Sequence, residues 1–364
     1  MPQYDSKIKE LEERIANTKY NKKTQHAIGQ YKAQIAKLKE QDFARSSKKS
    51  SGDGYQVRKT GDGTVILLGF PSVGKSTLLN TLTNASSEVA SYAFTTLTVI
   101  PGLLEYKHAK IQVLDVPGIV SGAASGKGRG REVLATIRNA DLVLILVDAL
   151  HPEHLPVIKR EIVETGVRIN QRKPDVKIVK KAKGGIDVGS TVKLTKIDED
   201  TVKAILTEFK INNADVVIRS DSDVDQFIDC VEGNKKYLPS ILVLNKIDLV
   251  SEKTLQNLKK SLKPDLCISA QKKEHIDELK ELIFERLDLI RIYLKEPGKE
   301  ADLKVPLIAF KSSTVRDICQ KLHKDFVKKF KFCRVWGKSA KFGGQKLMLN
   351  HGLKDKDILE LHIR

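Results

Sequence analysis

The sequence has 364 residues, and 40% of them are hydrophobic, so the chain can bury the cores of two or three domains and is not a disordered protein. Its 64 lysines and arginines outnumber its 46 aspartates and glutamates, which gives a net charge of +18. Four cysteines without a CxxC pair exclude a disulfide scaffold, and no apolar run fits a membrane span or a signal peptide. We therefore expect a cytoplasmic monomer that does not associate with a membrane.

Residues 6–40 carry apolar side chains at helical spacing. These residues recur every three or four positions in two groups, Ile8, Leu11 and Ile15, then Ile28, Tyr31, Ile35 and Leu38. Asparagines and threonines between the groups can cap a second helix. The pattern predicts a helical hairpin over residues 1–44, followed by a Ser-, Gly- and Lys-rich linker over 45–63.

The following segment alternates strand and helix patterns. Continuous apolar runs at 64–70, 111–116 and 141–148 are typical of parallel strands that are buried on both faces. The next comparable strand is 240–245, so residues 166–237 are an excess in an alternating α/β domain. Short strand-like pieces (176–180, 191–195, 215–219) and one helix pattern (200–209) make this excess a small α+β insertion. We predict an α/β domain over 64–292 that is interrupted by the insertion.

The C-terminal segment 293–364 has a different texture. A strand pattern at 305–311 precedes a helix pattern at 313–326, and three short strand patterns with turns follow. One helix across a small mixed sheet predicts a ubiquitin-like (β-grasp) domain. Thr314 and Asp317 have capping-box spacing at the start of the helix. We expect Cys319 and Cys333 to be buried thiols.

A glycine-rich segment, GFPSVGKS at 69–76, fits the pattern GxxxxGK[ST] between a predicted strand and a predicted helix. Such a loop turns backbone N–H groups toward phosphates, and the helix N-terminus favours their negative charge. Lys75 should reach the terminal phosphates, and Ser76 should bind Mg²⁺. The residues expected to contact nucleotide in this segment are Gly69, Pro71, Ser72, Val73, Gly74, Lys75, Ser76 and Thr77.

Two further motifs also follow predicted strands. Asp115 begins the pattern DVPG, where a carboxylate beside the phosphate loop can hold Mg²⁺ through water and the N–H of Gly118 can meet the γ-phosphate. In the pattern NKID at 245–248, the Asp248 carboxylate can accept two N–H groups that guanine offers and adenine lacks. Asn245, which precedes Lys246, would then brace the loop.

A fourth element, Ser269-Ala270, would bring a backbone N–H to guanine O6. Each of these motifs is modest by itself. All four in this order, each at the end of a strand, predict a guanine-nucleotide site and disfavour an ATPase or kinase.

The sequence resembles the translation-factor-related GTPases of the Obg superfamily, and most closely the developmentally regulated GTP-binding protein (DRG) family. The segments that carry the resemblance include GFPSVGKSTLLN, FTTLTVIPG, DVPGIVSGA and NNADVVIRSD. The resemblance covers essentially the whole chain. It implies a P-loop GTPase domain, a C-terminal TGS domain, Mg²⁺-dependent hydrolysis of GTP to GDP, action on ribosomes or RNA in translation, and a protein partner that stimulates or stabilises.

The resemblance also implies that a threonine of Phe94-Thr95-Thr96 is the switch I residue that contacts Mg²⁺ and the γ-phosphate. We expect Thr96 in this role and keep Thr95 as the alternative. The residues expected to act in catalysis are Lys75, Thr96 and Gly118, and those expected at the metal are Ser76, Thr96 and, through water, Asp115.

Many GTPases place a glutamine directly after DxxG to orient the attacking water, whereas this chain has Ile119. Intrinsic hydrolysis should therefore be slow, with the missing group supplied from elsewhere. A potassium ion is one candidate, although Ser72 stands where potassium-using relatives often carry asparagine. A protein partner is another candidate. The last is the basic, Gly-rich segment 126–131, which is otherwise a solvated part of switch II.

The net charge is concentrated at the two ends. Residues 1–60 hold 14 basic and 7 acidic residues, and residues 301–364 hold 15 basic and 6 acidic residues. Such ends favour a polyanionic partner, here RNA or the ribosome, over merely solvated faces. The C-terminal cations expected to meet RNA, around Phe326, Phe330 and Phe332, are Lys321, Lys324, Lys328, Lys329, Lys331 and Arg334.

Two alternatives remain at this stage. One is an RNA- or ribosome-binding scaffold in which the nucleotide is mainly structural, and Ile119 keeps this reading open. The other concerns His151 and His154, which could be metal ligands but are better explained as the start of a helix.

Overall fold

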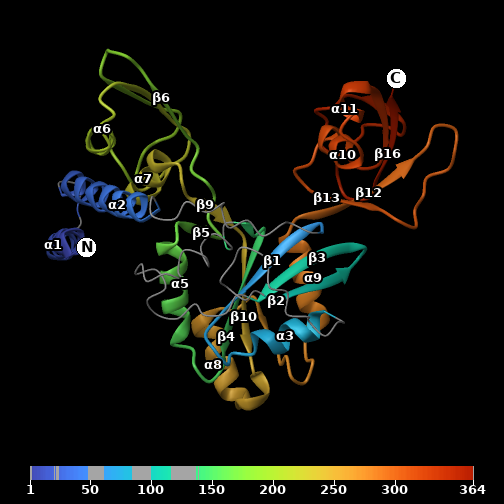
Figure 1. The fold of residues 1–364 in the computed structure, drawn as a ribbon, viewed down its shortest axis with the longest axis horizontal. Helices are drawn as coiled ribbons and strands as arrows, with labels where there is room; N and C mark the ends of the chain where they lie inside the picture. The colour runs from blue at the N-terminus through green and yellow to red at the C-terminus, as the bar shows by residue number, and fades with distance from the viewer. Residues whose placement is uncertain are drawn as a thin grey trace. The chain divides into compact units, whose positions relative to one another are not determined.

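The computed structural model describes residues 2–47 apart from 20, 22 and 23, then 61–83, 100–115, 137 and 139–363. The chain forms two compact units. One contains residues 1–54 and 171–237, and the other contains residues 55–170 and 238–364 (Figure 1). The short strands β5 (Val167–Ile169) and β9 (Lys236–Leu238) lie where the chain passes between the units.

A six-stranded sheet forms the centre of the larger unit. In spatial order its strands are β11 (Leu266–Cys267), β10 (Ser240–Asn245), β4 (Leu142–Asp148), β1 (Gly63–Leu68), β3 (Ala109–Asp115) and β2 (Ile100–Tyr106). All neighbouring strands are parallel except β2 and β3. Every residue of β1, β4 and β10 is buried, which confirms the expectation of parallel strands covered on both faces.

Helices cover this sheet on both sides and create two apolar cores. On one side lie α3 (Lys75–Leu82) and α9 (Ile276–Arg286), and on the other lie α5 (His154–Glu164) and α8 (Glu252–Leu262), as Figure 1 shows. A 3-10 turn, η1 (Ile247–Leu249), follows β10. This arrangement confirms the predicted α/β fold, with a largely parallel sheet between two layers of helices.

The C-terminal part is a five-stranded mixed sheet with two helices. In spatial order its strands are β13 (Leu307–Phe310), β12 (Leu289–Lys295), β16 (Asp357–Ile363), β14 (Phe330–Trp336) and β15 (Gln345–Leu347). The helices are α10 (Val315–Leu322) and α11 (Phe326–Lys329). Cys319 and Cys333 are fully buried in the core between α10 and the sheet, so the predicted buried thiols are confirmed. The Thr314–Asp317 capping box is also present.

The smaller unit joins the N-terminal helices to the insertion. It contains α1 (Pro2–Asn17), α2 (Gln25–Ser47), α6 (Glu199–Glu208), α7 (Val224–Glu232) and a sheet in the order β6 (Val176–Lys180), β8 (Ala214–Ile218), β7 (Ile186–Ser190). Ala33 of α2 is buried in the same core as Val202 and Ile205 of α6. A Cβ on Gly29 would lie 2.8 Å from Thr201 Cγ2, so only glycine allows α2 to approach α6 this closely.

Two local predictions in the insertion need correction. The strand expected at 191–195 is wrong, because β7 lies at Ile186–Ser190 and pairs in parallel with β8. Helix α7 was not expected from the sequence, and its first turn is held by a capping box between Asp223 and Gln226. No helix in the part of the chain that the structure describes is long and apolar enough to cross a membrane.

Candidate nucleotide-binding site

The predicted motifs come together at one edge of the six-stranded sheet. Because β1, β3, β4 and β10 run in parallel, the residues at their carboxyl ends share that edge. Leu67 is level with Asp115 in the register of β1 and β3, and Asn245 is level with Asp148 in that of β10 and β4. The phosphate-loop segment 69–74 therefore starts between two acidic strand ends.

Two glycines allow the phosphate loop its tight course. A Cβ on Gly69 would lie 2.6 Å from the carbonyl oxygen of Leu146, so this position permits no side chain. Gly74 has a φ of +96° at the N-cap of α3, and a Cβ there would lie 2.6 Å from Asn245 Nδ2. The loop is thus shaped by close backbone approach, as a phosphate cradle requires.

Lys75 is the buried cation of this site. It is only 8% exposed, and its Nζ donates hydrogen bonds to the carbonyl oxygens of Gly69 and Phe70 at 3.0 Å each. Burial lowers the pKa of the Lys75 ammonium group, and the nearby Asp115 carboxylate offsets only part of this effect. A buried ammonium with incomplete charge compensation is suited to an anionic ligand.

Ser76 and Asp115 form the candidate metal position. The Ser76 hydroxyl donates to Asp115 Oδ2 at 2.8 Å, which joins the start of α3 to the end of β3. The other carboxylate oxygen, Asp115 Oδ1, is buried and has no hydrogen-bond partner among the described residues. A hydroxyl beside a carboxylate with a free buried oxygen fits a hydrated Mg²⁺, which prefers oxygen ligands and keeps several waters.

Asn245 links three segments of the site. Its Nδ2 donates to the carbonyl oxygen of Val73 at 2.8 Å, and its Oδ1 accepts the backbone N–H of Ala270 at 3.0 Å. The residue is 2% exposed, so the network is inside the protein. Because the Ala270 N–H already has this acceptor, a bond from it to guanine O6 would require an exchange of partners. Ser269 is fully buried directly before it.

A residue that the sequence analysis did not assign, Asp148, holds the side chain of Lys246. Asp148 Oδ2 lies 2.6 Å from Lys246 Nζ, and Asp148 Oδ1 accepts the backbone N–H of Leu150 at 2.9 Å. The sequence signal that could have identified Asp148 is its position as an acidic residue at the carboxyl end of an apolar strand. Asp248 lies two residues after Lys246, in η1, is half-buried, and makes no ion pair within the described chain.

Several predicted residues lie outside the described part of the chain. These are Thr95, Thr96, Gly118, Ile119 and the basic segment 126–131. The expected roles of these residues in switch I, in switch II and in orienting the attacking water therefore stay predictions. Pro71, Ser72 and Thr77, by contrast, are described and exposed on the phosphate loop and the first turn of α3. Ser72 adopts a left-handed conformation with φ of +63°.

Of the two histidines flagged by sequence, His154 begins α5 beside the phosphate loop, and His151 lies three residues before it. The His154 ring stacks on Phe70 with 4.0 Å between centroids, and His151 stacks on His154 at 5.3 Å. No cluster of metal-binding side chains occurs among the described residues. The expected helix start is confirmed, because α5 begins at His154.

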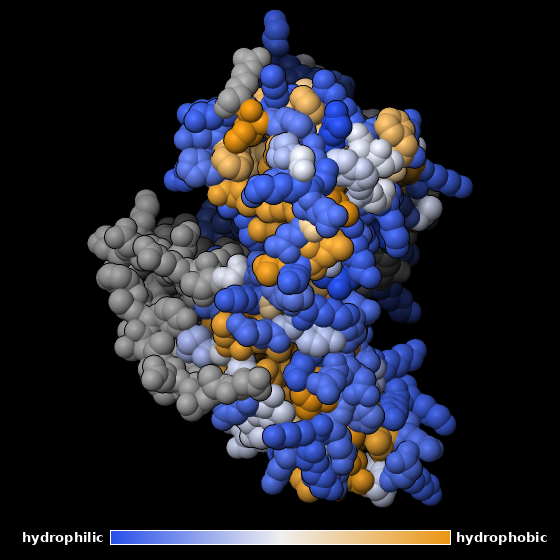
Figure 2. Space-filling model, turned by 90° about the vertical axis from the view of Figure 1, so that its right-hand side faces the viewer, coloured by the Kyte–Doolittle hydropathy of each residue, from blue (hydrophilic) through white to orange (hydrophobic). Residues whose placement is uncertain are grey.

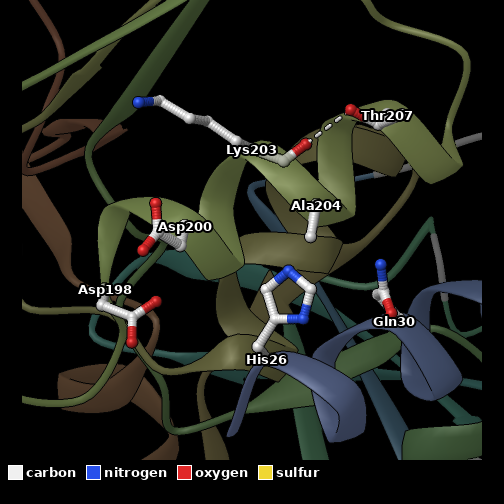
Figure 3. Close-up of a pocket in the computed structure, with 7 residues that line it drawn as sticks. All are labelled: His26, Gln30, Asp198, Asp200, Lys203, Ala204 and Thr207. Atoms are coloured by element: carbon white, nitrogen blue, oxygen red, sulfur yellow. Dashed lines mark hydrogen bonds between the residues drawn. The ribbon is translucent and has the colours of Figure 1, made fainter.

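A groove of the smaller unit offers no comparable chemistry. Figure 3 shows His26 and Gln30 of α2 on one side of the groove and Asp198, Asp200 and Lys203, from α6 and its N-terminus, on the other, with the Lys203 side chain directed away from α2. The groove is open, and Asp198 already caps α6 by accepting the N–H of Thr201. Both acidic and basic side chains line the groove, and they do not form a set that would bind one charged ligand.

Comparisons with known proteins agree with this geometry. Residues 64–181 match the family model described as 50S ribosome-binding GTPase, residues 183–289 match that of the C-terminal region of the MMR_HSR1 domain, and residues 290–363 match the TGS domain. An uncharacterised GTP-binding protein of Methanocaldococcus jannaschii is 54% identical, covering 99% of this chain and 93% of its own length.

Eukaryotic relatives match over the same span. Developmentally-regulated G-protein 3 of Arabidopsis thaliana is 46% identical over 98% of this chain and 97% of its own length. Developmentally-regulated GTP-binding protein 2 of Homo sapiens is 43% identical over 98% of each chain. The solved FeoB G-domain of Methanococcus jannaschii covers 63% of this chain and 99% of its own at 22% identity, with a TM-score of 0.33 that is too low to support an argument.

Proposed function

The chain belongs to the family of developmentally regulated GTP-binding proteins, and from that premise we propose that it binds GTP with Mg²⁺ and hydrolyses it to GDP and phosphate as a regulatory switch. The observation that carries the proposal is the convergence of the four motifs at one sheet edge. Lys75 is buried there with incomplete charge compensation, and one oxygen of Asp115 has no hydrogen-bond partner among the described residues.

In this proposal each described residue has a separate task. The backbone of residues 69–74 and the Lys75 ammonium bind the phosphates, and Asn245 keeps the phosphate loop and the Ala270 loop together. Asp248 accepts the guanine N–H groups, while Asp148 holds the neighbouring Lys246. These contacts bind and orient GTP.

Mg²⁺ would neutralise phosphate charge when bound, with Ser76 as a direct ligand and Asp115 acting through water. Thr96 of switch I and the backbone N–H of Gly118 in switch II would contact the γ-phosphate. The chain itself contributes the pre-formed Ser76–Asp115 pair. Release of the γ-phosphate would free the switches, which is how GTPases commonly change state.

Hydrolysis needs a group that Ile119 cannot supply, because an isoleucine side chain forms no hydrogen bond to water. We propose stimulation by K⁺ together with a protein partner. Turnover of GTP should then be faster in potassium buffer than in sodium buffer of equal ionic strength. Equal rates in the two salts would remove the cation from this scheme.

We propose that a cytoplasmic monomer of this kind acts on ribosomes or RNA in translation. The basic ends of the chain and the match to a model described as 50S ribosome-binding GTPase support this role. In the scaffold alternative, nucleotide would be bound but not turned over. Single-turnover GTP hydrolysis with and without ribosomes separates the two, because only a switch is expected to hydrolyse faster on its target.

The guanine assignment is tested by Asp248→Asn. An asparagine amide can face the oxygen that xanthine carries in place of the guanine amino group, so the variant should lose GTP affinity and gain affinity for xanthosine triphosphate. Titration of fluorescent GTP, ATP and xanthosine analogues measures this change. Wild-type protein that binds ATP as well as GTP would refute the assignment.

A further inference from the structure

The sheet of the TGS domain has a face opposite α10 that α9 covers only at one end, where Leu289 and Ile308 are buried in the core that contains α9. No other described helix covers this face. Ile292, Val335 and Leu359 point into the core beneath α10. Side chains alternate along each strand, so their neighbours lie on the opposite face. This open sheet face consists of Arg291, Tyr293 and Lys295 from β12, Phe332, Arg334 and Trp336 from β14, Lys346 from β15, and Ile358, Glu360 and His362 from β16.

The strand register arranges these side chains in rows. Cross-strand partners are Phe332 and His362, Arg334 and Glu360, and Trp336 and Ile358. Lys295 is level with Glu360 on its other side, and Lys346 is level with Arg334. A charged row therefore crosses four strands between two rows that contain rings. Such cross-strand neighbours are close enough to act on one ligand.

The only carboxylate of the open sheet face is already neutralised. Glu360 is 4% exposed, and its two oxygens bind Lys295 Nζ and His362 Nε2 at 2.7 Å each. Burial would raise the pKa of Glu360, but these two partners outweigh it and lower the pKa. Arg334 and Lys346 are exposed and form no ion pair within the described chain. The row thus presents uncompensated positive charge.

The rings beside this row are held in fixed positions. Phe332 stacks on His362 with 4.2 Å between centroids and 18° between planes, and Lys346 Nζ lies 4.3 Å from the Phe332 centroid. Lys295 Nζ lies 4.5 Å from the centre of the Trp336 ring. A Cβ on Gly343 would lie 3.0 Å from Trp336, so the following loop also packs against this ring. Little side-chain freedom remains to be lost on binding.

We propose that the open sheet face binds an unpaired RNA segment, with bases against Phe332, His362 and Trp336 and phosphates on Arg334 and Lys346. Aromatic rings among cations on a sheet are how single-stranded nucleic acids are commonly bound. The inference rests on the proposed action on ribosomes or RNA and names the surface that would perform it.

The observations favour RNA over a protein partner on this face. Protein interfaces usually have few lysines and glutamates at their centre, whereas here the charged row occupies the centre. On the side of the molecule that Figure 2 shows, hydrophobic and hydrophilic residues are mixed. The net charge of +9 over residues 301–364 adds a long-range attraction for phosphate.

The helix side of the same domain is less suited to this task. Lys321 is engaged with Asp62 at 2.7 Å and with the carbonyl oxygen of Ile308. Phe326 and Phe330 pack against the core of the domain. Lys324 and Lys328 remain exposed there, which makes them a matched control of equal charge.

The test is the affinity of the full chain for a labelled, unstructured 12-nucleotide RNA and for the corresponding duplex, measured by fluorescence anisotropy at several salt concentrations. The double variant Arg334→Gln/Lys346→Gln should bind the single strand about tenfold more weakly and lower the salt slope by about 1.4. Phe332→Leu should weaken binding about tenfold with an unchanged slope, because it removes only the aromatic face. The control Lys324→Gln/Lys328→Gln should change affinity less than twofold.

The variants must unfold at the same temperature as wild type for these effects to count. This is expected of the double variant, because Arg334 and Lys346 are exposed and their replacement removes no buried contact. Equal weakening by both double variants would overturn the proposal, and so would duplex RNA that binds as tightly as the single strand. If RNA binding persists in the sheet-face variants, only this inference fails. If wild-type protein binds neither RNA nor ribosomes, the proposed function fails with it.

Discussion

At the scale of single residues, Lys75 and Asp115 are both buried, and their charges and hydrogen-bonding groups are only partly satisfied by the described chain. The ammonium group is desolvated, and one oxygen of the carboxylate has no partner in the described chain. Buried polar groups are normally satisfied, so such exceptions mark sites where a ligand completes the bonding. This is why the two residues point to function more strongly than the exposed Ser76 or Thr77.

The variant Lys75→Met tests this interpretation. It should weaken GTP binding by about 100-fold or more, because two charge-assisted bonds of about 1.5–3 kcal/mol each are lost. Without nucleotide it should be at least as stable as wild type, since it removes a buried charge. Thermal unfolding with and without GTP measures both effects, and Lys253→Met on the exposed face of α8 is the control.

The pH dependence of Lys75 has a definite sign. Its pKa is lower in the folded protein than in the unfolded chain, so the unfolded state binds more protons between the two values. The stability of the nucleotide-free protein therefore gains a contribution as pH rises through the alkaline range below 10.5. Lys75→Met should lack this rise, and a variant that keeps it would contradict the assignment.

At the scale of elements, α10 shows how a short motif fixes a helix start. Asp317 Oδ2 accepts the backbone N–H of Thr314 at 2.7 Å and its hydroxyl at 2.8 Å. These bonds, the backbone one first, lower the pKa of Asp317. The contribution of the charged carboxylate is present above its unfolded pKa and is lost as pH falls through the lower folded value.

The variant Asp317→Ala should destabilise the TGS domain by about 1 kcal/mol, the usual effect of losing a helix cap. Trp336 is the single tryptophan and lies in β14, so its fluorescence in urea reports the unfolding of this domain. Glu300→Gln, an exposed change in the β12–β13 connection, is the control. An effect equal to that of the control would show that the cap contributes nothing.

At the scale of the whole molecule, the insertion packs against an N-terminal helix that precedes it by more than a hundred residues in the sequence. Ala33 of α2 is fully buried with Val202 and Ile205 of α6, and Lys37 Nζ donates to the carbonyl oxygen of Glu208 at 2.8 Å. Helix α2 is thus part of the core of the smaller unit, although it is far in sequence from the insertion that it covers.

Removal of residues 1–47 should therefore loosen the insertion without abolishing GTP binding. The buried face of α6 would become exposed, so amide exchange in 199–208 should rise at least about tenfold, while β4 should keep its protection. Removal of α1 alone, residues 1–17, is the matched control because α2 remains. Equal exchange in the two truncations would contradict the assignment of α2 to this core.

Much of the fold could be predicted because its signals are local. The apolar runs of β1, β4 and β10, the loop GFPSVGKS between a strand and a helix, and the capping spacing at Thr314 need only neighbouring residues to be recognised. The order of the motifs along the chain predicted a guanine-nucleotide site, and the resemblance of segments such as GFPSVGKSTLLN and NNADVVIRSD identified the family. The roles of Thr96 and Gly118 stay predictions, since these residues lie outside the described chain.

The sequence by itself determined the family and most of the elements and predicted the residues of the nucleotide site, because strand and helix periodicity and contiguous motifs are properties of short segments. Only the tertiary structure decided which distant residues meet. The Asp148–Lys246 pair, the packing of α2 on α6 and the Lys321–Asp62 contact all join segments that are far apart in sequence. The strand register likewise places Arg334 beside Lys346 and Glu360. The alternation of side chains along one strand does not specify which residues of a neighbouring strand lie opposite.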